Sequence, residues 1–203
     1  NLKNVSFSGY GISNFINGQA NAGANMNKIN ISGTENNFAM AMGRAIWNRG
    51  ILTFAEGSYA KFSGGIEIEN NNSNGAVVNF ENGSLVEMKN GIVGTGTVNI
   101  KGGTLKGKIT GSNVVNFNNG TWNLTGDSVV AGVVSDGDVT INGIDGNSLT
   151  VNNTITEKGK YAITHNSGTL TIKNLTIEDV IKEYNKQPAN DNGIVRASVL
   201  YSN

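Results

Sequence analysis

The feature that most constrains the fold is a set of short segments that nearly repeat one another along the chain. VVNFENGSLVEMKNG begins at Val77, VVNFNNGTWNLTGDS begins at Val114, and TVNIKGGTLKGKITG from Thr97 has the same skeleton between them. In each copy an asparagine stands before an inward apolar residue, the asparagines being Asn79, Asn99 and Asn116. Their spacing is close to one coil of a repeat protein, about 20 residues. Segments that recur at this distance indicate stacked, equivalent coils.

The short segments along the chain have the pattern of a β-strand with one face in solvent. IEIENNN places Ile66 and Ile68 on one side and Glu67 and Glu69 on the other, which is the period-two alternation of a strand. The inward series continues with Val78, Phe80, Leu85 and Met88. The chain carries 28 Gly against a single Pro, so turn residues occur at short intervals. We therefore predict an all-β solenoid, a parallel β-helix.

The alternative to this fold is an antiparallel sandwich or barrel. Asn82-Gly83 and Asn142-Gly143 are sequences that favour tight hairpin turns between antiparallel strands. The repeats favour the parallel coil, because equivalent positions would then stack into ladders of Asn on Asn and of Phe on Ile. Such ladders satisfy the side-chain amides and bury the rings together.

Two further correspondences extend the repeat toward both ends. AIWNRGILTF from Ala45 resembles AITHNSGTLTI from Ala162, and the final ASVLYSN resembles the first half of that unit. LKNVSF from Leu2 matches IKNLTI from Ile172, the segment that follows the unit. We expect a single solenoid over residues 1–203 that begins and ends inside a repeat, as a piece of a longer solenoid would.

Two stretches interrupt the rhythm and are expected to be excursions from the coil, at about residues 13–27 and 177–192. The first consists mostly of Asn, Gly and Ala. In the second, Val180, Ile181 and Tyr184 fall at helical spacing and Pro188 would end a helix, which favours a short helix or an ordered loop. Binding in solenoids is commonly carried by such excursions. The candidate partner-binding residues are therefore those of the second stretch: Val180, Ile181, Tyr184, Lys186 and Asn190.

Composition argues against several classes of partner. Lys plus Arg equals Asp plus Glu at 15 each, so no charge excess favours nucleic acid or an anionic membrane. The chain has no Cys, which removes disulfides and thiolate metal sites. No apolar run is long enough for a membrane span, and the first residues lack the pattern of a signal peptide.

Few residues suggest catalysis or metal binding, and we expect neither a cofactor nor a metal. His165 is the only histidine and is best interpreted as a turn residue, equivalent to Trp47 or Asn48, because the sequence places no Ser or Asp to work with it. Glu67 and Glu69 could be read as the carboxylate pair of a glycosidase, but they fit an ordinary solvated face.

Three aspartates raise the question of calcium. Asp136, Asp138 and Asp145 lie close together in SDGDVTINGIDG and carry the oxygen ligands that calcium prefers. Their spacing fits neither the twelve-residue calcium loop nor a glycine-rich nonapeptide repeat. Turn-forming aspartate is the favoured interpretation.

GRAIWNRGILTF, YAITHNSGTLTIKNLTI and GTGTVNIKGGTLKGKITG together resemble passenger domains of bacterial type V autotransporters, including adhesins like the polymorphic outer-membrane proteins. The resemblance implies a right-handed parallel β-helix that a C-terminal barrel, not included in this sequence, presents outside a Gram-negative outer membrane. Secretion is the alternative location. It also implies a partner that is a host-cell protein or glycan, or a neighbouring cell. This piece lacks the regular Phe-x-x-Asn and doubled-glycine copies of the polymorphic proteins, and it has no serine-protease motif.

The sequence is therefore compatible with three functions. The first is a non-catalytic segment of a surface adhesin. The second is a polysaccharide lyase or hydrolase, which would need Asp136 and Asp138 to converge with a Lys or Arg in a groove. The third is ice binding through outward rows of threonine such as Thr150, Thr169 and Thr171.

Overall fold

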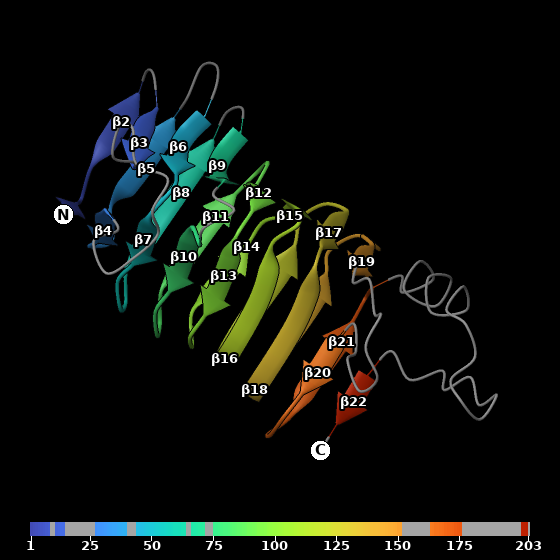
Figure 1. Cartoon of the computed structure of the whole chain (residues 1–203). Helices are drawn as coiled ribbons and strands as arrows, with labels where there is room; N and C mark the ends of the chain where they lie inside the picture. Colours follow the sequence, from blue (N-terminus) through green and yellow to red (C-terminus); the bar gives the residue numbers. More distant parts are fainter. Residues whose placement is uncertain are drawn as a thin grey trace, which may run out of the picture.

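The computed structural model describes residues 1–8, 11–14, 27–39, 44–63, 66–71, 75–151, 163–175 and 200–202. These residues form 22 strands and no helix, and every pairing between their strands is parallel. The strands follow one another along a single axis, from β2 beside the N-terminus to β22 beside the C-terminus (Figure 1). The prediction of a parallel β-helix is confirmed, and the antiparallel alternative is wrong.

The strands form three faces. The first face contains β1 (Leu2–Lys3), β4 (Lys28–Ser32), β7 (Ile51–Phe54), β10 (Val77–Phe80), β13 (Thr97–Ile100), β20 (Ile163–His165) and β22 (Leu200–Ser202). The second contains β2 (Ser6–Ser8), β5 (Asn36–Ala39), β8 (Tyr59–Ser63), β11 (Leu85–Met88), β14 (Thr104–Lys106) and β21 (Leu170–Lys173). Two long strands, β16 (Val114–Leu124) and β18 (Gly132–Gly143), run through both faces and join them into one sheet.

The third face is a separate sheet. It contains β3 (Ile12–Asn14), β6 (Arg44–Asn48), β9 (Ile66–Asn71), β12 (Ile92–Thr95) and β15 (Ile109–Gly111). The pair β17 (Ser128–Val130) and β19 (Leu149–Val151) continues it beyond β15. From β1 to β15 each coil therefore consists of one strand per face, whereas in the next two coils one long strand, β16 or β18, covers the first and second faces.

The predicted register holds at the centre of the stack. Asn79 pairs with Asn99, and Asn99 pairs with Asn116. Their amides form a ladder, since Asn116 Nδ2 donates to Asn99 Oδ1 at 3.0 Å and Asn99 Nδ2 donates to Asn79 Oδ1 at 2.9 Å. The two steps span 17 and 20 residues, so coils of different length still bring the amides into register.

A second asparagine ladder lies inside the coil, at the corner between the third and first faces. Asn48, Asn70 and Asn113 are fully buried. Asn48 Nδ2 donates to Asn70 Oδ1 and Asn70 Nδ2 donates to Asn113 Oδ1, both at 3.0 Å. Asn70 and Asn113 are 43 residues apart, and the coil between them has Gly96, where a Cβ would lie 2.5 Å from Asn70 Nδ2. The small residue makes room for the amide to reach across.

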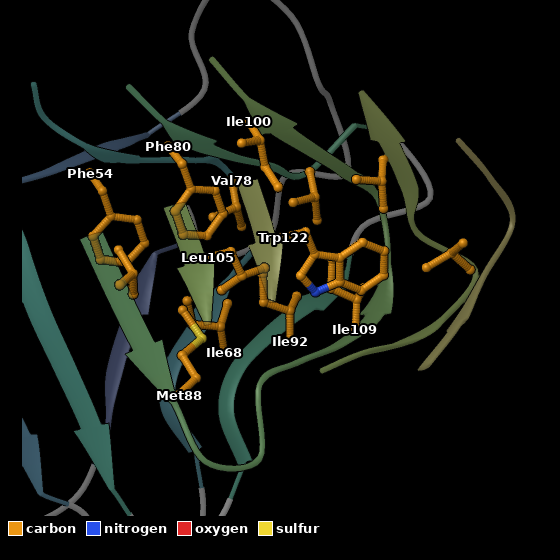
Figure 2. Packing of buried hydrophobic residues seen from close by; sticks show 14 of the residues in the cluster. Phe54, Ile68, Val78, Phe80, Met88, Ile92, Ile100, Leu105, Ile109 and Trp122 are labelled. Carbon is orange, nitrogen blue, oxygen red and sulfur yellow. The ribbon is translucent and has the colours of Figure 1, made fainter. Parts of the chain in front are cut away.

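The core is the interior that the three faces enclose (Figure 2). Phe54 and Phe80 stack at 5.1 Å between ring centroids, and Phe38 and Phe62 stack at 4.5 Å. Trp122 is fully buried, and its Nε1 donates to the Gly107 carbonyl at 2.8 Å. Each such side chain contributes about 1.5 to 3 kcal/mol through burial.

The predicted inward series is correct except for Leu85. Val78, Phe80, Ile68 and Met88 are buried, but Leu85 is 37% exposed. Val86 is the buried residue instead. Leu85 and Met88 are three residues apart, so a strand with period two cannot place both on one side. The side chains of Ile66 and Glu67 lie outside the described residues.

The hairpin sequence Asn82-Gly83 forms a corner of the coil. It lies between β10 and β11, which belong to the first and second faces. The turn is closed by Ser84 N, which donates to the Glu81 carbonyl at 3.0 Å. A tight turn can thus redirect the chain from one face to the next without pairing the strands that it connects.

The end-to-end correspondences were only partly correct. Leu200–Ser202 does pair in register with Ile163–His165. However, the Ala45 unit begins on the third face in β6, whereas the Ala162 unit contains β20 on the first face. Likewise, Leu2–Lys3 lies on the first face and Leu170–Lys173 on the second. Similar sequences of two strands and a turn therefore occur at different corners of the coil. The turns themselves are alike, since Asn4 and Asn174 both have a positive φ, of 51° and 55°.

Candidate functional site

The predicted partner-binding residues Val180, Ile181, Tyr184, Lys186 and Asn190 lie outside the described residues, as does Pro188. The expected helix or loop at 177–192 lies there as well. Of the expected excursion at 13–27, residues 15–26 lie outside the described part, whereas Ser13 and Asn14 belong to β3.

His165 is not a turn residue. It is 4% exposed and ends β20, in register with Ser135, which is in register with Phe117. It therefore lies in the inward column of the first face, where the preceding coils have Phe80 and Ile100. The predicted equivalence of His165 with Trp47 or Asn48 is wrong, because those two residues lie on the third face.

A serine does accompany His165, contrary to the expectation from sequence. Ser135 Oγ lies 2.9 Å from His165 Nδ1, and His165 Nε2 lies 3.1 Å from the Gly168 carbonyl oxygen. Ser135 is fully buried, however, and a nucleophile must be reachable by its substrate. The pair satisfies two polar groups within the core, and its geometry supports a structural role.

The aspartates bond to the next coil. Asp138 Oδ1 accepts a hydrogen bond from Thr169 N at 3.0 Å, and Asp136 Oδ1 accepts one from Ser167 Oγ. Asp145 is a turn residue with φ of 59°. Within the described residues, no group of three or more His, Cys, Asp or Glu side chains is arranged to hold a metal ion, and neither Asp136 nor Asp138 forms an ion pair.

Another aspartate, Asp127, is held in the same way. Its Oδ1 accepts hydrogen bonds from Ser148 N at 2.8 Å and from Ser148 Oγ at 2.9 Å. The backbone bond first, then the side-chain bond, lowers the pKa of the Asp127 carboxyl, and nearby Lys108 acts in the same direction. Sequence inspection missed this contact, because its partner is one coil away.

Glu69 is not on an ordinary solvated face. It is 8% exposed and forms an ion pair with Arg44. The described residues thus give no pair of solvent-accessible carboxylates at this strand. The glycosidase interpretation of Glu67 and Glu69 has no support from Glu69.

Two arginines lie against Trp47, which belongs to β6 of the third face. The Arg49 guanidinium carbon lies 4.5 Å from the centroid of the Trp47 ring, and that of Arg44 lies 5.1 Å from it. Trp47 is half-buried and Arg49 is exposed. We call Arg44, Trp47, Arg49 and Glu69 the arginine–tryptophan cluster. The alternation of β6 could have predicted an outward Trp47, whereas the contribution of Glu69 comes from the neighbouring coil.

The outer surface of the second face carries a column of threonines. Thr104, Thr121, Thr140 and Thr171 are in register with one another from β14 to β21. Thr150 lies on the third face and Thr169 precedes β21, so the row proposed from sequence is not a single row. Beside the column, Asn142 Nδ2 donates to Asn123 Oδ1 at 3.1 Å, and Asn174 Nδ2 donates to Asn142 Oδ1 at 2.9 Å.

The described residues contain no helix that is long and apolar enough to cross a membrane. No family model, no curated protein and no solved structure matches the chain.

Proposed function

We propose that the chain is a non-catalytic, surface-exposed segment of a bacterial autotransporter adhesin that attaches to host cells or to neighbouring bacteria. Its place would be outside a Gram-negative outer membrane or in secreted form. The observation that carries the proposal is the outer surface of the coil, where polar side chains repeat in register on adjoining faces.

The repeated columns make an extended and regular contact surface. The threonine column of the second face and the half-buried Asn99 and Asn116 of the first face present hydroxyl and amide groups at the spacing of neighbouring strands, about 4.8 Å. A solenoid uses such a surface to bind a partner through many weak contacts along its length. A deep pocket is not required for this type of recognition.

The arginine–tryptophan cluster is the proposed anchor of this surface among the described residues. Tryptophan and arginine dominate the binding energy of many protein interfaces, because both combine apolar area with directional polar groups. Arg44 is ion-paired with Glu69, so its guanidinium is held at the surface beside Trp47. Arg49 is exposed and directly follows β6, which ends at Asn48.

The test is binding of the purified chain to cultured host cells, to bacteria and to a glycan array. Arg49→Ala should reduce binding severalfold, since loss of an interface arginine commonly costs more than 1 kcal/mol. Lys89→Ala is the matched control, because Lys89 is also an exposed cation and directly follows β11 of the second face, whereas β6 belongs to the third. A variant lacking residues 178–192 tests the second expected contact.

Wild-type chain that binds none of these surfaces would contradict the proposal. Equal binding by wild type, by Arg49→Ala and by the variant lacking residues 178–192 would show that neither the cluster nor residues 178–192 is the contact. Turnover of a polysaccharide by wild-type chain would instead support the enzymatic alternative.

A further inference from the structure

We propose that Asn82 is a site of spontaneous chemical modification, at which the folded protein converts its side-chain amide into an aspartate or isoaspartate. This inference is independent of adhesion. It rests on the difference between the corner that contains Asn82-Gly83 and the other Asn-Gly pairs of the coil.

The reaction requires a particular local geometry. The backbone nitrogen of the following residue attacks the side-chain carbonyl carbon of asparagine, ammonia leaves, and a five-membered succinimide forms. Water then opens the ring at either carbonyl, giving aspartate or isoaspartate. A following glycine favours the attack because it has no Cβ to obstruct the approach. The asparagine amide must also be free to turn toward that nitrogen.

Four Asn-Gly pairs lie wholly within the described residues, beginning at Asn82, Asn90, Asn119 and Asn142. Both Asn82 and Gly83 are exposed, whereas Gly91 and Gly143 are buried. A Cβ placed on Gly83 would meet nothing closer than Gly57 N at 3.7 Å, so there is open space beside Gly83, whose nitrogen donates a hydrogen bond to the Gly102 carbonyl at 3.1 Å. At Gly143 the same Cβ would collide with the Asn174 carbonyl.

The side-chain amides of these asparagines also differ in their hydrogen bonds, and the difference again favours reaction at Asn82. Asn119 Oδ1 accepts a hydrogen bond from Asp138 N at 2.9 Å, and its Nδ2 donates to Asn118. Asn142 both donates and accepts in the second-face ladder. The Asn82 amide lies over Gly102 of the next coil without a hydrogen bond to it. The Asn82 amide therefore has no side-chain hydrogen bond to break before it turns, and the bond that must open is the one from Gly83 N to the Gly102 carbonyl.

The consequence reaches the neighbouring coils. The Asn82 carbonyl accepts from Gly57 N at 3.0 Å, and Gly83 N donates to the Gly102 carbonyl at 3.1 Å. Isoaspartate adds a methylene to the main chain at this point, so both bonds would lose their geometry. The new carboxylate would also lie next to Glu81, which is paired with Lys101 at 3.1 Å. The modification would loosen this corner on both sides.

The experiment is incubation of the folded chain in mildly alkaline buffer, followed by digestion under acidic conditions and peptide mass spectrometry. The expected result is that the peptide containing Asn82 loses ammonia and then gains water roughly tenfold faster than those containing Asn119 and Asn142, whose hydrogen bonds must open first. In chain unfolded by urea, the three peptides should react at similar rates. The Asn82→Gln variant should lose the fast signal.

Conversion of Asn119 or Asn142 as fast as Asn82 in the folded chain would overturn the proposal. An unreactive Asn82 in folded chain, or the same order of rates in unfolded chain, would do so as well. In those cases the fold does not select this site.

Discussion

At the scale of single residues, the fold is held by side chains that repeat the same contact in successive coils. Asn99 is the clearest case, because it donates to Asn79 and accepts from Asn116. An amide has both a donor and an acceptor, so one residue type can continue such a ladder without limit. The same logic applies inside the coil to Asn48, Asn70 and Asn113.

Asn99→Ala should therefore lower the free energy of unfolding by about 1 to 3 kcal/mol, since it removes two hydrogen bonds and leaves a donor and an acceptor unpaired. Urea unfolding followed by circular dichroism measures this change. Asn82→Ala is the control, because that exposed amide has no hydrogen bond, and its effect should stay within about 0.5 kcal/mol. Equal effects at the two sites would refute a stabilising ladder.

Asp127 gives a pH dependence of known sign. Its carboxyl has a pKa below the ordinary value of 3.8 in the folded chain, so it stabilises the fold above that value. This stabilisation is lost as the pH falls through the lowered pKa. The difference in urea midpoint between wild type and Asp127→Asn should be present at neutral pH and shrink in acid. A difference that grows in acid would have the wrong sign.

At the scale of elements, corners and strand ends decide which sequences fit. Gly94 and Gly111 are in register on β12 and β15, with φ of 115° and 102°. A Cβ on Gly111 would collide with the Gly94 carbonyl. The third face can stack closely here only because both residues lack side chains.

Gly111→Ala should therefore destabilise the chain by more than about 1 kcal/mol, through both the collision and the positive φ. Gly132→Ala is the matched control, because nothing lies within 4 Å of its added Cβ. Thermal unfolding compares the two variants. A midpoint lowered as much by Gly132→Ala as by Gly111→Ala would show that the close approach of strands is not what requires glycine.

The core offers a second prediction at this scale. Phe80→Ala should cost about 3 to 5 kcal/mol, because the fully buried ring stacks on Phe54 and its removal leaves a cavity between coils. Leu85→Ala removes a side chain of similar apolarity from the same coil, but one that is 37% exposed, and should cost much less. Comparable losses in urea unfolding would contradict the inward assignment of Phe80.

The comparison of sequence and structure shows what repeats can and cannot predict. Alternation and repeat spacing correctly placed Phe80, Ile100 and Phe117 in one column, because both are local properties of the chain. The prediction for His165 was wrong, because the sequence of two strands and a turn does not show which two faces of the coil the strands belong to. Glu69 was missed for a different reason: its partner Arg44 belongs to the preceding coil, and coil length varies. Contacts between coils require the register to be known first.

At the scale of the whole molecule, the coil turns a low-charge sequence into a long surface with repeated polar columns. The chain has a net charge of zero, so partner binding through this surface should depend weakly on salt, apart from the contribution of Arg49. Raising the salt concentration in the cell-binding assay should reduce wild-type binding only to the level of Arg49→Ala. A near-complete loss would point to electrostatic attraction that this charge balance does not explain.

The stacking of successive coils in parallel register is the central claim, and the absence of native Cys allows a direct measurement. Thr97 and Val114 are register partners on neighbouring strands of the first face. Thr104 and Val114 are closer in sequence but lie on different faces.

In chains with two introduced cysteines, mild oxidation should cross-link Thr97→Cys to Val114→Cys, because neighbouring strands bring Cα atoms within disulfide distance. Thr104→Cys with Val114→Cys should remain reduced. Cross-linking of the second pair but not the first would contradict the parallel coil.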